Sequence, residues 1–204
     1  MKKLKKLDVE YDQVVVLDFL SETERRKHQI TIELESLFKA NRIGIMPVYL
    51  NNRNDLESIM NTLIQLAKSG KRFMIHFVAH GNVDGIGFKE TAEFISWVDL
   101  EPLLISLNKE CQNTVVLNMT TCFGLHGIKT VNPFSSDKPF FGLIGYTEKL
   151  KIVKGKQANS HFYTSVFNGL QFNEALKALQ LQTNDLRFHC ITSEGYSFLK
   201  NKGE

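Results

Sequence analysis

A series of short apolar runs, each without polar alternation, constrains the fold of this chain more than any other feature. Such runs stand at residues 14–19, 73–79 and 114–119, and segments with helical spacing separate them. A strand that is apolar on both faces is covered on both faces, which is typical of a parallel sheet between helices. The pattern therefore predicts a three-layer α/β/α sandwich built on a mostly parallel sheet of about six strands.

The connections between these runs carry recognisable helix signals. Ser21 and Glu24 have capping-box spacing, and the helix they begin is expected to continue through Phe38, while Ser96 and Asp99 form a similar pair. The remaining predicted elements are strands at residues 43–50, 140–146 and 187–192, a helix at 56–67, a basic connector at 149–156, and helices at 159–170 and 173–179.

Length and composition limit the function classes. A chain of 204 residues with 43% hydrophobic residues is expected to form one domain, residues 1–204, with a real core. Its net charge of +3 is too small for a protein that mainly neutralises phosphates, so nucleic acid is not an expected direct partner. No run of about 18 apolar residues occurs, so no membrane span is expected.

The cysteines favour a reducing compartment. Cys111, Cys122 and Cys190 are odd in number and widely spaced, which fits neither a disulfide framework nor a four-ligand zinc site. The basic N-terminus lacks the apolar run of a secretion signal. We therefore expect a soluble, cytoplasmic protein with Cys111 and Cys190 packed in the interior. No dinucleotide or Walker motif occurs, so we expect no cofactor.

Two reactive side chains follow predicted strands. His80 ends one strand and Cys122 ends another, 42 residues later. Because parallel strands end at the same sheet edge, neighbouring strands would bring the two side chains together. A thiol needs a base to become a nucleophile at neutral pH, and histidine can supply it. Gly81 lacks a Cβ, so its N–H could approach a substrate carbonyl and form an oxyanion hole with that of Cys122.

Each residue alone has a plainer interpretation, since a lone cysteine is usually a small buried hydrophobe and a strand-end histidine is usually structural. Their joint occurrence at two strand ends favours the catalytic interpretation. His76, four residues before His80, has no acidic or Cys ligand at a matching spacing, and we interpret it as a core residue rather than part of a metal site.

The segments around both residues resemble a known group of enzymes. Residues 77–81 look like the strand-His-Gly segment of caspase-like cysteine peptidases, and residues 115–122 resemble their strand-to-Cys segment. Further similarities point to the CHAT branch, which is related to separases. These lie at residues 95–100, 142–145, 162–169 and 174–176. The resemblance implies a caspase-like sandwich.

The resemblance also implies peptide-bond hydrolysis by a dyad. His80 would be the general base and later the acid, Cys122 the nucleophile, and the N–H groups of Gly81 and Cys122 would bind the oxyanion; no third member is required. Where metacaspases place an Asp that helps to hold a basic P1 side chain, this chain has Thr120. Neither an acidic nor a basic P1 preference carries over, and we expect a neutral or apolar pocket. The pocket candidates are Thr120, Phe123, Asp84 and His126.

The expected partners follow from the same resemblance. CHAT-like peptidases are often joined to repeat or sensor modules and, in bacteria, are often linked to antiphage defence or controlled cell death. Besides a protein substrate, we therefore expect a separate activating sensor or scaffold protein, and a homo-oligomer remains open. The alternative is a non-catalytic α/β interaction module on the same scaffold, in which His80 and Cys122 are incidental.

Overall fold

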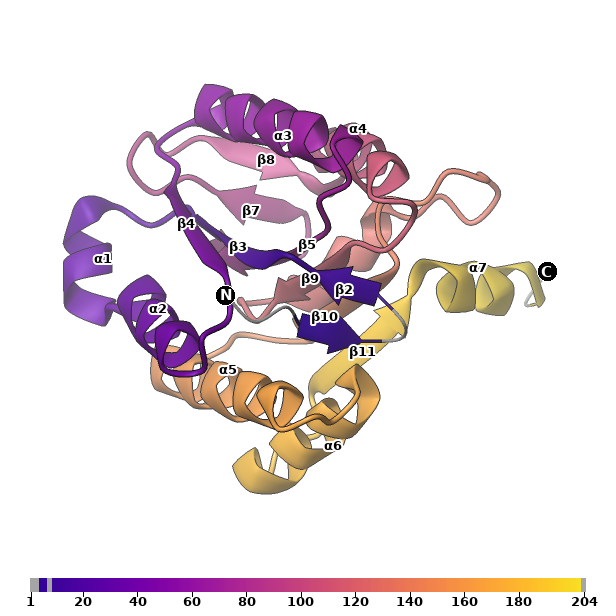
Figure 1. The fold of residues 1–204 in the computed structure, drawn as a ribbon. Coiled ribbons are helices and arrows are strands. Elements are labelled where there is room, and N and C mark those ends of the chain that lie inside the picture. The colour runs from indigo at the N-terminus through magenta and orange to yellow at the C-terminus, as the bar shows by residue number, and fades with distance from the viewer. Residues whose placement is uncertain (1–3, 7–8, 203–204) are drawn as a thin grey trace.

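The computed structural model describes residues 4–6 and 9–202 and has a six-stranded central sheet (Figure 1). Its strands lie in the order β11-β10-β9-β5-β3-β4, and all pairs are parallel except β10 with β11. They are β3 (Gln13–Asp18), β4 (Ile45–Tyr49), β5 (Phe73–Val78), β9 (Val116–Met119), β10 (Gly142–Tyr146) and β11 (Phe188–Thr192). The predicted mostly parallel sheet is confirmed.

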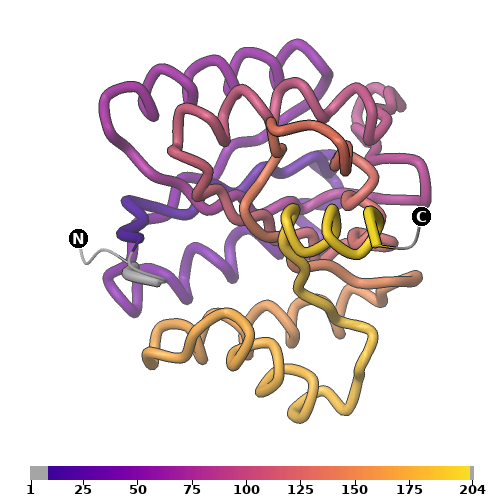
Figure 2. Tube along the Cα trace, turned by 90° about the vertical axis from the view of Figure 1, so that its right-hand side faces the viewer, coloured from indigo at the N-terminus to yellow at the C-terminus, as the bar shows by residue number. Residues whose placement is uncertain are grey.

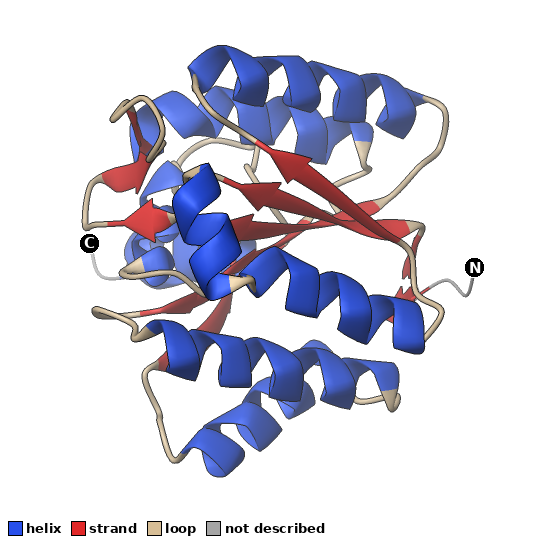
Figure 3. Cartoon of the chain, turned by 90° about the vertical axis from the view of Figure 1, so that its left-hand side faces the viewer, coloured by secondary structure: helices blue, strands red, loops and turns tan. Residues whose placement is uncertain are grey.

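Helices cover both faces of this sheet (Figure 3). On one face lie α3 (Arg53–Lys68) and α4 (Trp97–Glu110), and on the other lie α2 (Ile30–Ala40), α5 (Ile152–Phe167) and α6 (Phe172–Thr183). The alternation of side chains along β3 shows the two layers, because Val15 and Leu17 pack with α3 and α4, whereas Val14 and Val16 pack with α2 and α5.

Short elements complete the chain. The structure adds an antiparallel pair of β1 (Leu4–Lys6) and β2 (Val9–Tyr11), and a small antiparallel sheet of β6 (His80–Gly81), β7 (Gly85–Gly87) and β8 (Phe94–Ser96). A 3-10 helix, η1 (Gly124–Thr130), follows β9, and α7 (Ser193–Lys202) follows β11. Lys138 donates to the Ser197 hydroxyl at 2.8 Å, so α7 contacts the loop before β10 (Figure 2). No helix among the described residues is long and apolar enough to cross a membrane.

The helix expected from Ser21 through Phe38 is two helices, which corrects that prediction. Both bonds of the Ser21–Glu24 capping box form and start α1 (Glu22–His28), but Gln29 adopts a left-handed φ of 53° and separates α1 from α2. No residue of α1 is buried, whereas α2 buries Leu34 and Phe38. The break lets α2 pack on the sheet while α1 stands beside the ends of the strands (Figure 3).

Two further predictions are wrong. The basic stretch 149–156 is not a connector throughout, because α5 begins at Ile152 and includes Lys154 and Lys156. The ammonium of Lys154 forms an ion pair with the buried carboxylate of Asp185, so this basic residue packs as part of α5. Cys190 is exposed on β11, an edge strand, whereas Cys111 is fully buried as predicted.

Candidate active site

The carboxyl ends of β5 and β9 place His80 and Cys122 at one edge of the sheet. The two strands pair directly, with His76 opposite Asn118. Both His80 and Cys122 line a cavity of about 210 Å³ at this edge. Other walls come from Leu150 with the first turns of α5, and from the junction of α1 and α2. The predicted neighbouring strand ends therefore occur, and both reactive side chains face the same space.

Gly81 lies against the backbone of Cys122. A Cβ at Gly81 would stand 2.4 Å from the carbonyl oxygen of Cys122, which is closer than any side chain can approach. The backbone N–H of Cys122 donates no hydrogen bond within the described residues. These two segments are thus in direct contact, and one free N–H stands beside the thiol. This contact is the geometric basis for an oxyanion hole at Gly81 and Cys122.

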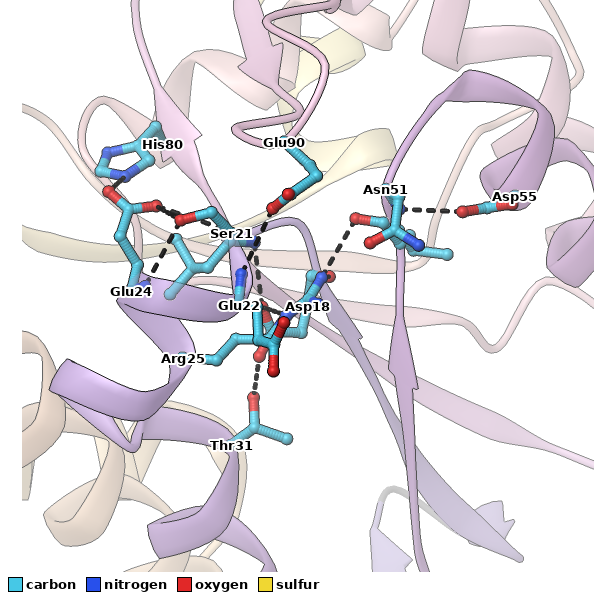
Figure 4. Close-up of polar contacts among 12 residues, drawn as sticks. Asp18, Ser21, Glu22, Glu24, Arg25, Thr31, Asn51, Asp55, His80 and Glu90 are labelled. Carbon is cyan, nitrogen blue, oxygen red and sulfur yellow. Dashed lines mark hydrogen bonds and ion pairs between the residues drawn. The ribbon is translucent and has the colours of Figure 1, made fainter.

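His80 has a carboxylate partner that the sequence did not indicate. Its Nε2 lies 2.9 Å from Oε1 of Glu24, and the side chains are 51% and 19% exposed respectively (Figure 4). The Glu24 side chain comes from the first turn of α1, where its other oxygen accepts from the N–H and hydroxyl of Ser21. The capping box thus holds the carboxylate that orients the imidazole.

The pKa of Glu24 reports this pairing. Partial burial would raise it, but the hydrogen bond and charge of His80, with the hydrogen bonds from Ser21, outweigh burial and lower the pKa of Glu24 below its ordinary value. The carboxylate is therefore ionised at neutral pH. When it accepts from the Nε2–H of a neutral imidazole, the Nδ1 lone pair of His80 is left to accept a proton.

The Cys122 thiol is held by the backbone of Leu150. Leu150 donates its N–H to Sγ at 3.3 Å, and Sγ lies 3.6 Å from the Leu150 carbonyl oxygen. No hydrogen bond joins Cys122 to His80 in the part of the chain that the structure describes. The sulfur is therefore engaged by the Leu150 backbone and not by the imidazole.

The other pocket candidates divide into two groups. Thr120 lines the cavity beside Cys122, and its hydroxyl donates to Asn118. Phe123, Asp84 and His126 do not line it. Phe123 stacks edge-on with His126, and Asp84 lies 3.8 Å from Lys129 on the surface.

His76 lies beneath the cavity in the layer of α5. It is buried, and its Nδ1 is 2.9 Å from the hydroxyl of Tyr163, which also accepts from Nδ2 of Asn118 at 3.3 Å. Complete burial lowers the pKa of His76 to about 3, so the ring is neutral. No group of three His, Cys, Asp or Glu residues suited to a metal occurs among the described residues. The predicted core role of His76 is confirmed.

Sequence reasoning missed Glu24 and Asn159. Glu24 carried a capping-box signal, but its pairing with a histidine 56 residues away had no signal of its own. Asn159 lines the cavity from α5, is only 4% exposed, and its side-chain oxygen has no hydrogen-bond partner. An unsatisfied buried amide is unusual in a folded protein. Its place within an expected helix gave no hint of this environment.

Fold and site together define an α/β protein with a mostly parallel six-stranded sheet and a His- and Cys-lined cavity at the carboxyl edge. The sequence matches no protein-family model and no curated protein. Among solved structures, Raptor from Chaetomium thermophilum is similar, with 11% identity and a TM-score of 0.44. The match covers 85% of this chain, which spans about a fifth (21%) of the Raptor chain. A likeness at that level carries no argument about function.

Proposed function

We propose that this protein is a caspase-like cysteine endopeptidase in which His80 and Cys122 hydrolyse peptide bonds of a protein substrate. The observation that carries the proposal is the contact between two strand ends. Because β5 pairs with β9, His80 and Cys122 line one cavity, and Gly81 packs against Cys122 without room for a Cβ. The resemblance to CHAT peptidases supports the same roles.

The proposed reaction begins with proton transfer from the thiol of Cys122 to Nδ1 of His80. The sulfur then attacks the scissile carbonyl carbon, and the carbonyl electrons move to oxygen, where the N–H groups of Gly81 and Cys122 stabilise the charge. As the intermediate collapses, the C–N bond breaks and His80 gives its proton to the leaving amine. Water, deprotonated by His80, hydrolyses the thioester and restores the thiol. Glu24 is a positioning residue that holds Nε2–H.

The thiol contacts support a latent resting state. Sγ of Cys122 is engaged by the backbone of Leu150 rather than by His80. A separate activating sensor or scaffold protein would have to shift the segment around Leu150 so that the sulfur meets the imidazole. The proposed setting is a response such as antiphage defence or controlled cell death.

New peptide termini provide the direct test of this proposal. Cells expressing the wild-type chain, Cys122→Ala or Cys190→Ala are compared by mass spectrometry of protein N-termini. We expect new termini with the wild type and with Cys190→Ala, because the Cys190 thiol lies on an edge strand away from the cavity, and none with Cys122→Ala. The same termini in cells with folded Cys122→Ala would overturn the proposal.

A non-catalytic interaction module is the second candidate. The observation that favours it is the same engagement of Cys122 with Leu150 and not with His80. The rate of iodoacetamide alkylation separates the candidates, with glutathione as the reference thiol, because burial raises the pKa of the Cys190 thiol to about 11. A nucleophilic Cys122 reacts faster than glutathione and slows in His80→Ala. If Cys122 reacts no faster than glutathione and cells with the wild-type chain show no new peptide termini, the interaction module is the better account.

A further inference from the structure

The residues that line the cavity beside Cys122 favour an uncharged guest side chain. No carboxylate lines it, so a lysine or arginine side chain would enter without a counter-ion. Its one lysine, Lys156, is already engaged, because Nζ forms an ion pair with Glu33 and donates to the carbonyl oxygen of His28 at 3.1 Å. A cationic guest would therefore be buried without a counter-ion, and an anionic guest would meet a Lys156 ammonium that is already paired.

Asn159 presents an unused carboxamide to this cavity. It lies one turn beyond Gly155, where α5 passes the end of β9 at ordinary van der Waals distance, since a Cβ there would be 3.8 Å from the Thr120 carbonyl oxygen. The side chain of Asn159 makes no hydrogen bond within the described residues, although it is 4% exposed. A buried amide without partners costs folding free energy. Such a cost is repaid when a ligand supplies both an acceptor for Nδ2 and a donor for Oδ1.

His76 adds a second donor to the same cavity wall. The Tyr163 hydroxyl accepts from Asn118 and has one hydrogen to give, and the acceptor 2.9 Å away is Nδ1 of His76. The hydrogen of the neutral ring then resides on Nε2, which has no hydrogen-bond partner among the described residues. A neutral N–H donor suits a carbonyl oxygen, and it offers no charge to a carboxylate.

From these contacts we propose that the cavity is the S1 subsite and that it selects a glutamine or asparagine side chain at P1. The guest carboxamide accepts from His76 and Asn159 and donates to the Asn159 oxygen. The methylene groups of the guest lie against apolar walls that include Leu20 and Ile152. This inference rests on the proposed peptidase function, because it assumes that Cys122 attacks the residue held here.

Thiol-directed peptide probes test the inference on the intact chain, in extracts of cells in which the wild-type chain produces new peptide termini and the proposed peptidase is therefore active. Three tripeptide acyloxymethyl ketones are identical except for P1, which is Gln, Glu or Met; these side chains are similar in size and differ in charge and polarity. The Cys122 sulfur bonds to the ketone methylene, the carboxylate leaves, and the thiol proton passes to His80. Intact mass, with peptide mapping, gives the labelling rate at each cysteine. We expect the Gln probe to label Cys122 at least about tenfold faster than the Glu probe.

Asn159→Leu removes the carboxamide while keeping the volume, and Asn168→Leu is the matched control at the exposed end of the same helix. We expect Asn159→Leu to favour Met over Gln and Asn168→Leu to keep the wild-type order. A thermal unfolding midpoint for Asn159→Leu no lower than that of the wild type shows that the variant is folded.

The labelling experiment distinguishes a failure of the S1 inference from a failure of the proposed peptidase function. If the probes label Cys122 faster in the wild type than in His80→Ala but the Gln probe has no advantage over Met and Glu, or Asn159→Leu keeps the Gln preference, the S1 inference is wrong and the peptidase proposal remains. If no probe labels Cys122 faster in the wild type than in His80→Ala, the proposed function fails, and the S1 inference fails with it.

Discussion

Two histidines four residues apart occupy opposite environments in this molecule. His76 lies inside β5, is 1% exposed, and contacts the uncharged hydroxyl of Tyr163. His80 lies just beyond β5, has a side chain 51% exposed, and contacts the ionised carboxylate of Glu24. Because the two histidines are four residues apart and fall on one face of an extended chain, their spacing in the sequence gives no sign of this difference.

The two environments give the two histidines different properties. Burial holds His76 neutral and fixes it in a hydrogen-bond network with Tyr163 and Asn118, so it cannot exchange protons at neutral pH. The exposure of His80 leaves its imidazole accessible from solvent, and the carboxylate of Glu24 fixes its orientation. We therefore expect substitutions of His80 to change reaction rates with little effect on stability, and substitutions of His76 to change stability as well as the proposed P1 preference.

Replacement of His80 should have the largest effect. His80→Gln removes the base and keeps a polar side chain, so we expect the rate of Cys122 labelling by the Gln probe to fall by about 10²–10⁴-fold. Because the side chain is half exposed, the free energy of unfolding should change little. Labelling kinetics and urea unfolding measure the two quantities. A folded His80→Gln protein that labels at the wild-type rate contradicts the assigned role.

The buried histidine should show the reverse behaviour. His76→Ala leaves a cavity and removes the partner of the Tyr163 hydroxyl, so we expect a loss of about 2–4 kcal/mol in the free energy of unfolding. Urea unfolding gives this value, and Thr164→Ala, at an exposed position next to Tyr163, serves as the control. A loss smaller than that of His80→Gln would break the contrast between the two histidines.

The same contrast explains how far the sequence could predict this molecule. Unbroken apolar runs such as residues 14–17 identified central strands, since full burial on both faces leaves a direct compositional signal. Ser21 and Glu24 identified a helix start for the same local reason. Gln29 carried no breaker signal, because its left-handed backbone serves the packing of α2 against the sheet.

Long-range pairing accounts for the site residues that were missed. The strand ends placed His80 and Cys122 together because sheet topology brings parallel strands to one edge. Glu24 and Asn159 join them from helices on different segments, and no local pattern encodes such a meeting. The sequence thus predicted that His80 and Cys122 lie at one sheet edge, and it did not reveal Glu24, which contacts His80, or Asn159, which lines the cavity.

A smaller change in stability is expected for Asn159, which lines the cavity from α5. Asn159→Leu removes an amide oxygen that is buried without a partner, so we expect the free energy of unfolding to rise by about 1 kcal/mol. Urea unfolding measures the change, and Asn168→Leu, at an exposed position, should show none. A clear loss of stability would show that Asn159 supports the fold rather than a ligand.

A small effect on stability is also expected at the carboxylate that distinguishes His80 from His76. Glu24→Gln keeps a residue compatible with the capping box but removes the charge, so we expect a loss below about 1 kcal/mol at pH 7, because His80 is half exposed. The labelling rate of Cys122 should fall by about tenfold, a fraction of the loss expected for His80→Gln. Glu22→Gln is the control, since this residue of the same turn is 69% exposed and pairs with Arg26 instead.

The pH dependence of that stability difference has a definite sign. The pKa of Glu24 is lower in the folded chain than its ordinary value, so the charged carboxylate stabilises the fold above the unfolded value of about 4.3. As the pH falls through the lower folded value, the carboxyl becomes neutral in both states and its contribution is lost. Urea unfolding of wild type and Glu24→Gln from pH 7 to pH 3 should therefore show two curves that converge at the acidic end. A difference that is as large at pH 3 as at pH 7 would mean that the ionised carboxylate does not stabilise the fold through its contact with His80.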